Sequence, residues 1–186
     1  MQHMQERKNK AKQERGFTLL EMMIALAVLT LGVLSLAGML ANSLTYMKNS
    51  QNDFIAQQKA QEALEAIYTA KYDNTITFSQ VANTSSTPPG VFLSTPQPIL
   101  QPGSDGLVGT SADSTANPAY IYLPGPDGLM GTADDLTVPL SGFTRTITIT
   151  PYPGDTNLKT ITVTVSYGSG RYARSYTMNS YISAFN

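Results

Sequence analysis

The sequence predicts an α+β protein in which a long N-terminal helix packs on a C-terminal antiparallel β-sheet. Three observations predict this fold class. An apolar stretch begins at Phe17, an amphipathic pattern follows it to about Ala70 without a proline, and residues 143–186 alternate between polar and apolar side chains. Turn-forming residues fill the segment between helix and sheet, so the 186 residues form one globular unit with a long N-terminal appendage.

The charges of the chain are concentrated at its N-terminus. Residues 1–16 hold five of the twelve Lys and Arg against two Glu, a formal +3, and the rest of the chain has a formal −4. Lys and Arg beside a short apolar span tend to stay in the cytoplasm. We therefore expect a cytoplasmic leader and an exported C-terminal part. The chain has no cysteine, so no disulfide can stabilise that exported part.

An uncharged apolar segment follows the leader. From Met22 to Ala41 there are 20 residues without a charge, which as a helix would span roughly 30 Å, about one bilayer core. Glu21 stands at its edge, and an acid placed deep in a membrane costs on the order of 2.5–3.5 kcal/mol. Because no Lys, Arg or His occurs between Phe17 and Tyr46, a positive partner must come from another chain or from a newly cut amino terminus.

The second half of the predicted helix is amphipathic. Its sequence "FIAQQKAQEALEAIYTA" places Ala56, Ala60, Ala63 and Ile67 at helical spacing. One helix of roughly 80 Å is expected, with an apolar half at residues 17–41 and an amphipathic half at residues 42–71. A filament subunit needs both halves, whereas a simple anchor needs only the first. The alternative is a helical stalk that lifts the domain off the membrane, and Gly32 and Gly38 are positions where the helix could loosen.

Residues 72–142 form a loop-rich variable region. Nine of the eleven prolines lie there, together with the short β-like pieces "ITFSQV", "AYIYL" and "LTVPL". Two similar stretches follow each other at a spacing of 22 residues, "PGSDGLVGTSADST" and "PGPDGLMGTADDLT". Calcium prefers clustered carboxylate and carbonyl oxygens, so both loops are candidate calcium sites, the second more than the first. The alternative is a pair of Asp-Gly turns. The candidate ligands are Asp105, Asp113, Asp127, Asp134 and Asp135.

Residues 143–186 predict an antiparallel sheet. The segments "FTRTITIT", "LKTITVTVSY" and "RYARSYTMNSYISAF" alternate with a period of two, and "YGSGR" supplies a turn. One apolar row is expected to pack on the helix near Ala63 and Ile67. That row consists of Ile161, Val163, Val165 and Tyr167.

Several kinds of chemistry are excluded by composition. Once residues 1–16 are removed the chain has no His, Cys or Trp, which excludes histidine-based acid–base catalysis, Cys-His nucleophiles and histidine-ligated zinc. We therefore expect no enzyme. On a strand, Arg171 and Arg174 would point to opposite faces and the rest of the chain is acidic, so nucleic-acid binding is disfavoured.

The stretch "RGFTLLEMMIALAV" resembles the class III signal of type IV prepilins and type II secretion pseudopilins. The resemblance implies that a prepilin peptidase cuts between Gly16 and Phe17 and methylates the new amine of Phe17. It also implies that Glu21 pairs with that amine on a neighbouring subunit during assembly. The helix on a sheet agrees with the pilin-like architecture, and the second Asp-Gly loop resembles the calcium loop of major pseudopilins.

The resemblance is greatest to minor pilins of the pilus-modification type. It implies a structural subunit held in the bacterial inner membrane by one span, with its N-terminus cytoplasmic, and later packed into a pilus. The implied partners are prepilin peptidase, other pilin or pseudopilin subunits and the inner-membrane assembly machinery. Two alternatives stay open: a pseudopilin of a type II secretion system, and an unprocessed membrane-anchored binding module.

Overall fold

The computed structural model describes residues 16–113, 118–168, 170 and 173–185. Its first element is helix α1, Leu19–Tyr72, which is continuous over 54 residues and passes through Gly32 and Gly38 without a break. The helix ends where Asn74 adopts a left-handed conformation (φ 57°) and its N–H donates to the Lys71 carbonyl. Two compact units can be distinguished, one ending at Met47 and the other beginning at Lys48.

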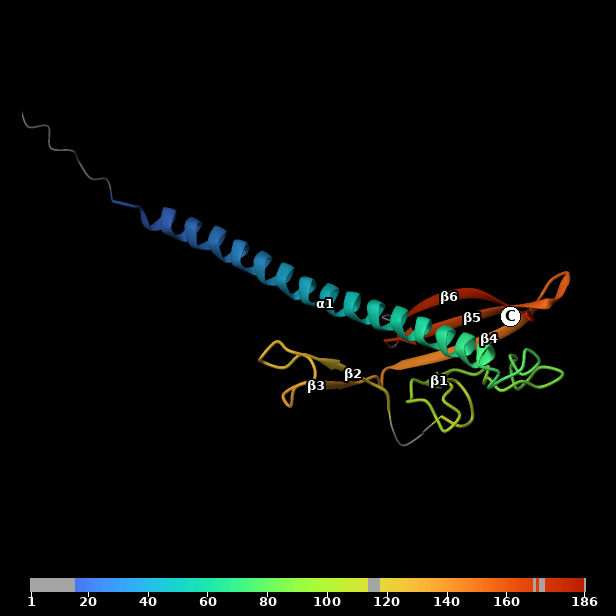
Figure 1. Ribbon diagram of the computed structural model, residues 1–186. Helices are drawn as coiled ribbons and strands as arrows, with labels where there is room; N and C mark the ends of the chain where they lie inside the picture. Colours follow the sequence, from blue (N-terminus) through green and yellow to red (C-terminus); the bar gives the residue numbers. More distant parts are fainter. Residues whose placement is uncertain (1–15, 114–117, 169, 171–172, 186) are drawn as a thin grey trace, which may run out of the picture. The chain divides into compact units, whose positions relative to one another are not determined.

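The C-terminal sheet has four antiparallel strands in the order β1-β4-β5-β6 (Figure 1). The strands span Gln97–Pro98 (β1), Phe143–Tyr152 (β4), Asp155–Tyr167 (β5) and Arg174–Ser183 (β6). The expected α+β fold class, a long N-terminal helix with a C-terminal antiparallel sheet, is confirmed. The expected turn "YGSGR" connects β5 to β6, and part of it lies outside the described residues.

The core of the second unit lies between the amphipathic part of α1 and the sheet. The buried row of β5 is the expected one, and it belongs to the same hydrophobic cluster as Ala63 and Ile67. Three of the helix positions that are fully buried in this core carry alanine, namely Ala56, Ala60 and Ala63.

The variable region contains one β-hairpin and many turns. Strands β2 (Tyr120–Leu123) and β3 (Leu136–Pro139) pair antiparallel where "AYIYL" and "LTVPL" were expected to be extended. The expectation for "ITFSQV" was wrong, because this segment is a turn. The Gln80 side chain accepts a hydrogen bond from the Thr77 N–H at 2.8 Å, and the Gln80 N–H donates to the Thr77 carbonyl at 3.0 Å. These local hydrogen bonds outweigh the alternating pattern.

Candidate functional site

The N-terminus of α1 begins with a capping residue. The Thr18 hydroxyl oxygen accepts a hydrogen bond from the Glu21 N–H at 3.2 Å, which satisfies one of the backbone donors that the first helical turn leaves open. Thr18 and Glu21 have the spacing of a capping box. Sequence reasoning missed the role of Thr18, although the Thr-x-x-Glu spacing was a visible signal for it.

The side chains around the expected cleavage point are open to solvent. Phe17 is 77% exposed and an added Cβ on Gly16 would meet nothing within 4 Å. The Glu21 carboxylate lies in the first turn of α1, where its negative charge interacts favourably with the helix dipole. Within the part of the chain that the structure describes, this carboxylate has no hydrogen-bond or ion-pair partner. The segment is therefore accessible to a processing enzyme and to a positively charged group of another molecule.

The apolar half of α1 exposes its side chains all round. The most apolar window of the helix has a mean hydropathy of 2.4 and none of it is buried. Its hydroxyl groups are satisfied within the helix: Thr30 donates to the Ala27 carbonyl at 2.8 Å, and Ser35 to the Leu31 carbonyl at 2.8 Å. Such back-bonding lets polar side chains lie in an apolar environment without an unpaired donor. The helix is long and apolar enough to cross a membrane.

The comparison with known families decides the reading of this segment. Residues 11–37 match the model of the prokaryotic N-terminal methylation motif. The N-terminus is therefore type IV prepilin-like. No curated protein and no solved structure matches the chain. The motif implies processing by prepilin peptidase and assembly with other pilins, and together with the apolar helix it supports membrane anchoring of the precursor. It points to a structural protein.

The two Asp-Gly loops of this prepilin-like chain form a structural repeat. In the first loop Asp105 accepts the Leu107 N–H at 3.1 Å, and in the second Asp127 accepts the Leu129 N–H at 2.8 Å. Glycines at corresponding positions of the two loops have similar left-handed backbone conformations, which are strained for any residue with a side chain. The two pairs are Gly106 and Gly128 (φ 69° and 71°) and Gly109 and Gly131 (φ 81° and 84°). The turn interpretation of both loops therefore has direct geometric support.

The surroundings of the two loops differ. The first loop is part of the core, with Leu107 and Val108 buried, whereas the corresponding Leu129 and Met130 of the second are 62% and 58% exposed. The second loop connects β2 to β3 at the tip of their hairpin (Figure 1). The repeat therefore presents on the surface an apolar pair that the first copy buries.

The predicted calcium ligands accept hydrogen bonds from their own loops. The Asp134 carboxylate accepts the Thr132 hydroxyl at 2.6 Å and the Asp127 N–H at 3.3 Å, and these bonds lower the pKa of Asp134. Asp135 accepts the Gly131 N–H at 2.7 Å. In the described residues no group of three or more acidic side chains is placed to hold a metal ion. Calcium binding at the two loops stays a prediction.

The charge of the buried Arg145 acts on Asp113 of the first loop. Its Oδ2 accepts the Gly109 N–H at 2.8 Å, while its buried Oδ1 has no hydrogen-bond partner among the described residues. Burial raises the pKa of Asp113, and the nearby Arg145 charge opposes that rise. A cation in this position disfavours a calcium ion at Asp113, because the two positive charges would repel each other.

Arg145 is a feature that sequence reasoning missed. It lies on the core face of β4 and is 2% exposed, and none of its guanidinium nitrogens has a hydrogen-bond partner among the described residues. Burial lowers its pKa, and the charges of Glu62 and Asp113 oppose this. The signal was present, because Arg145 falls in the same period-two row as Phe143 and Ile147.

One of the two arginines that were considered for nucleic-acid contact is used within the fold. Arg174 at the start of β6 forms an ion pair with Asp53 of α1 at 3.2 Å, and the Tyr167 hydroxyl donates to the same carboxylate. Burial and then the Asp53 carboxylate raise the pKa of Tyr167. Arg171 lies outside the described residues. Arg174 therefore joins the helix to the sheet.

Proposed function

We propose that the chain is a structural subunit of a type IV pilus, most similar to a minor pilin. It is made as an inner-membrane precursor, cut between Gly16 and Phe17, methylated on the Phe17 amine and packed into the filament through its apolar helix. The match of residues 11–37 to the methylation motif carries the proposal. The minor-pilin role rests on the likeness of the N-terminal stretch to pilus-modification pilins and on the lack of the cysteine pair that many major pilins use.

The exposed apolar half of α1 supports this function. An apolar helical surface of this length is stable in lipid or against other apolar helices, but not in water. A groove beside Gly32, lined by Val28, Leu29 and Leu36, adds a place where another helix can approach closely. Filament packing would replace lipid by neighbouring helices without exposing this surface.

The Glu21 carboxylate supports the assembly step. The described part of the chain offers it no cation, and cleavage after Gly16 would create one at Phe17. In the apolar interior of a filament, an ammonium and a carboxylate from adjacent subunits attract each other more strongly than in water. Such a pair fixes the register of neighbouring subunits more reliably than it adds net stability.

Coexpression with a prepilin peptidase tests the processing step. We expect the full chain to lose the mass of residues 1–16 and to gain one methyl group on Phe17, as read by intact-mass and N-terminal peptide mass spectrometry. The Gly16→Leu variant should stay uncut, whereas Gly38→Ala, which changes a glycine with open space around it, should be cut normally. An intact N-terminus in the unaltered chain would instead identify an unprocessed membrane-anchored module.

A second candidate is a type II secretion pseudopilin. The acidic loop around Asp127 favours it, because that loop resembles the calcium loop of major pseudopilins. A deletion of the gene in its host separates the two functions. Loss of surface fibres or of surface motility with normal secretion supports the pilus, and loss of exported enzymes with normal fibres supports the secretion machine.

A further inference from the structure

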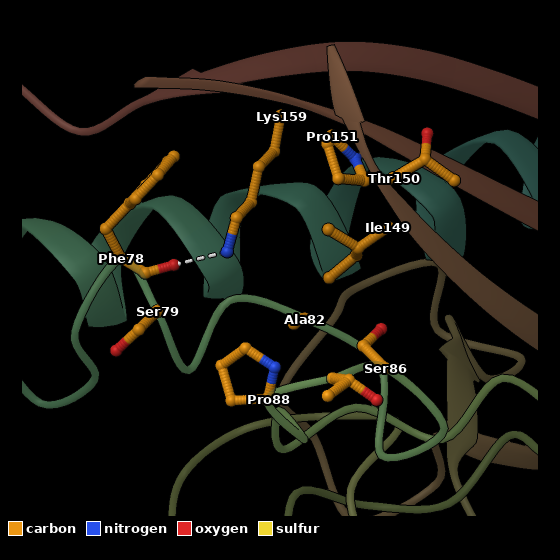
Figure 2. A pocket seen from close by; sticks show the side chains of 10 residues that line it. Phe78, Ser79, Ala82, Ser86, Pro88, Ile149, Thr150, Pro151 and Lys159 are labelled. Atoms are coloured by element: carbon orange, nitrogen blue, oxygen red, sulfur yellow. Dashed lines mark hydrogen bonds between the residues drawn. The ribbon is translucent and has the colours of Figure 1, made fainter. Parts of the chain in front are cut away.

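A pocket of about 500 Å³ opens in the second unit, between the turn that follows α1 and the sheet (Figure 2). Its walls are mainly apolar and include Phe78, Pro88, Ile149 and Pro151. Ser79, Ser86 and Thr150 are also among the lining residues. The volume falls within the range of small-molecule sites, which combine apolar walls with a few polar groups.

One cation stands in the wall of this pocket. The Lys159 side chain reaches in from β5, and its Nζ donates to the Phe78 carbonyl at 2.7 Å (Figure 2). The same Nζ donates to the Val81 carbonyl at 2.8 Å. The Nζ also lies 4.4 Å from the centre of the Phe78 ring. The Lys159 ammonium has three hydrogens, and two of them are donated to these carbonyl oxygens. The third has no oxygen partner among the described residues.

No carboxylate among the described residues forms an ion pair with Lys159. Ion pairs in the described part of the chain join Lys59 to Glu62 and Arg174 to Asp53, and Lys159 takes part in neither. Burial lowers the pKa of Lys159, and no neighbouring carboxylate opposes this shift. Carbonyl groups solvate an ammonium but do not neutralise it, so a partly buried cation in an apolar pocket favours the entry of an anion.

We propose that this pocket binds a small organic carboxylate that carries an apolar group. The carboxylate would accept the free N–H of Lys159 and the hydroxyl of Ser79, Ser86 or Thr150, while the apolar group would contact Pro88, Ile149 and the Phe78 ring. This site is separate from the segment that is processed and assembled. The proposal is the same whether the chain is a pilus subunit or a simple anchored protein.

Methyl NMR on the full chain in detergent micelles tests the proposal. The probes are 3-phenylpropanoate and its neutral isostere 3-phenylpropanamide, titrated against protein labelled on isoleucine and alanine methyl groups. We expect the carboxylate to shift the Ile149 and Ala82 methyl signals with a Kd on the order of 1 mM, as suits a ligand of this size. The amide should bind at least about tenfold more weakly, because it lacks the charge-assisted bond.

Two variants locate the charge that recognises the probe. Lys159→Met should reduce carboxylate binding to the level of the amide. Lys48→Met, which removes an exposed charge that does not line the pocket, should leave carboxylate binding unchanged. The comparison of the two probes on the unaltered chain needs no variant to fold. Equal binding of both probes, or no shift of the pocket methyls up to about 20 mM of the carboxylate, would overturn the proposal.

Discussion

From Leu19 to Met47 and from Lys48 to Tyr72 the backbone is one continuous helix, yet the two stretches bury their side chains differently. All seven buried residues of α1 lie in the second stretch, between Ile55 and Ala70. The first stretch is more apolar and has none. A segment can therefore form a helix without burying its apolar side chains within the chain. The second stretch buries its apolar side chains against the rest of its own unit. The first stretch needs an apolar environment that the described residues do not supply.

The largest effect is expected from the charge at the start of the first stretch. Glu21→Gln keeps a side chain that suits a capping box but removes the charge that would pair with a neighbouring amine. We expect membrane insertion and cleavage to continue and filament incorporation to fall at least about tenfold, since a buried amine without its partner is strongly unfavourable. Immunoblots of sheared fibres against membrane fractions measure the ratio.

Two control variants separate charge from helix capping in this experiment. Thr18→Ala removes the cap and keeps the charge, so it should cost only about 1 kcal/mol of helix stability and leave incorporation near normal. Glu65→Gln removes an exposed carboxylate from the second stretch and should have no effect on incorporation. If the Glu21→Gln variant enters filaments as well as the unaltered chain does, the proposal that Glu21 pairs with a neighbouring amine is wrong.

The next effect concerns folding of the second stretch onto the sheet. Ile67→Ala should lower the free energy of unfolding of the second unit by about 2–5 kcal/mol, because Ile67 is fully buried. Leu34→Ala in the first stretch removes a similar side chain that is 68% exposed, and it should leave that free energy unchanged. Urea unfolding of the full chain in detergent, followed by tyrosine fluorescence, compares them. Equal losses would mean that the first stretch also stabilises the folded domain.

The elements that the sequence predicts well are those with a long local period. The helix and the row from Ile161 to Tyr167 repeat their pattern many times, so tertiary contacts reinforce what each segment already prefers. Strand β1 has only two residues, which is too short for a period to be seen. Arg145 was missed because a charged residue was not expected on a core face, although its row predicts that position.

The two Asp-Gly loops show why other features cannot be predicted locally. Their sequences are similar and their turns have similar backbone conformations, yet one is buried and the other exposed. The difference comes from neighbours that are distant in sequence. An added Cβ on Gly109 would lie 2.6 Å from the Ile147 Cδ1, whereas one on Gly131 would meet nothing within 4 Å. No pattern within either loop contains this information.

Matched glycine variants measure that difference. Both Gly109→Ala and Gly131→Ala place a side chain in a left-handed conformation, at a cost of about 1–2 kcal/mol. Gly109→Ala must also displace Ile147, so it should lose about 1–3 kcal/mol more. The same unfolding assay gives both values. Equal losses would show that the first loop does not pack against Ile147 as closely as the structure has it.

The smallest effect is expected from calcium on the second loop, which stays a prediction. Asp127 and Asp134 are exposed and Asp135 is half-buried, whereas Asp113 of the first loop is under the influence of the Arg145 charge. Binding would require the carboxylates to exchange hydrogen bonds within the loop for the ion, which suggests a Kd on the order of 0.1–1 mM. Millimolar calcium should then stabilise the full chain by about 1 kcal/mol, a rise in Tm of about 2–4 °C.

Aspartate variants decide whether such a calcium effect arises at the second loop. Asp127→Ala and Asp134→Ala should abolish the difference in Tm between calcium and chelator. Asp105→Ala is the matched control: it removes the corresponding turn carboxylate of the first loop, so it should lower Tm in both conditions and keep the difference. A melt that is the same with calcium and with chelator in the unaltered chain would leave the two loops as turns that differ only in what covers them. In that case their burial, and not their carboxylates, would be the physical difference between them.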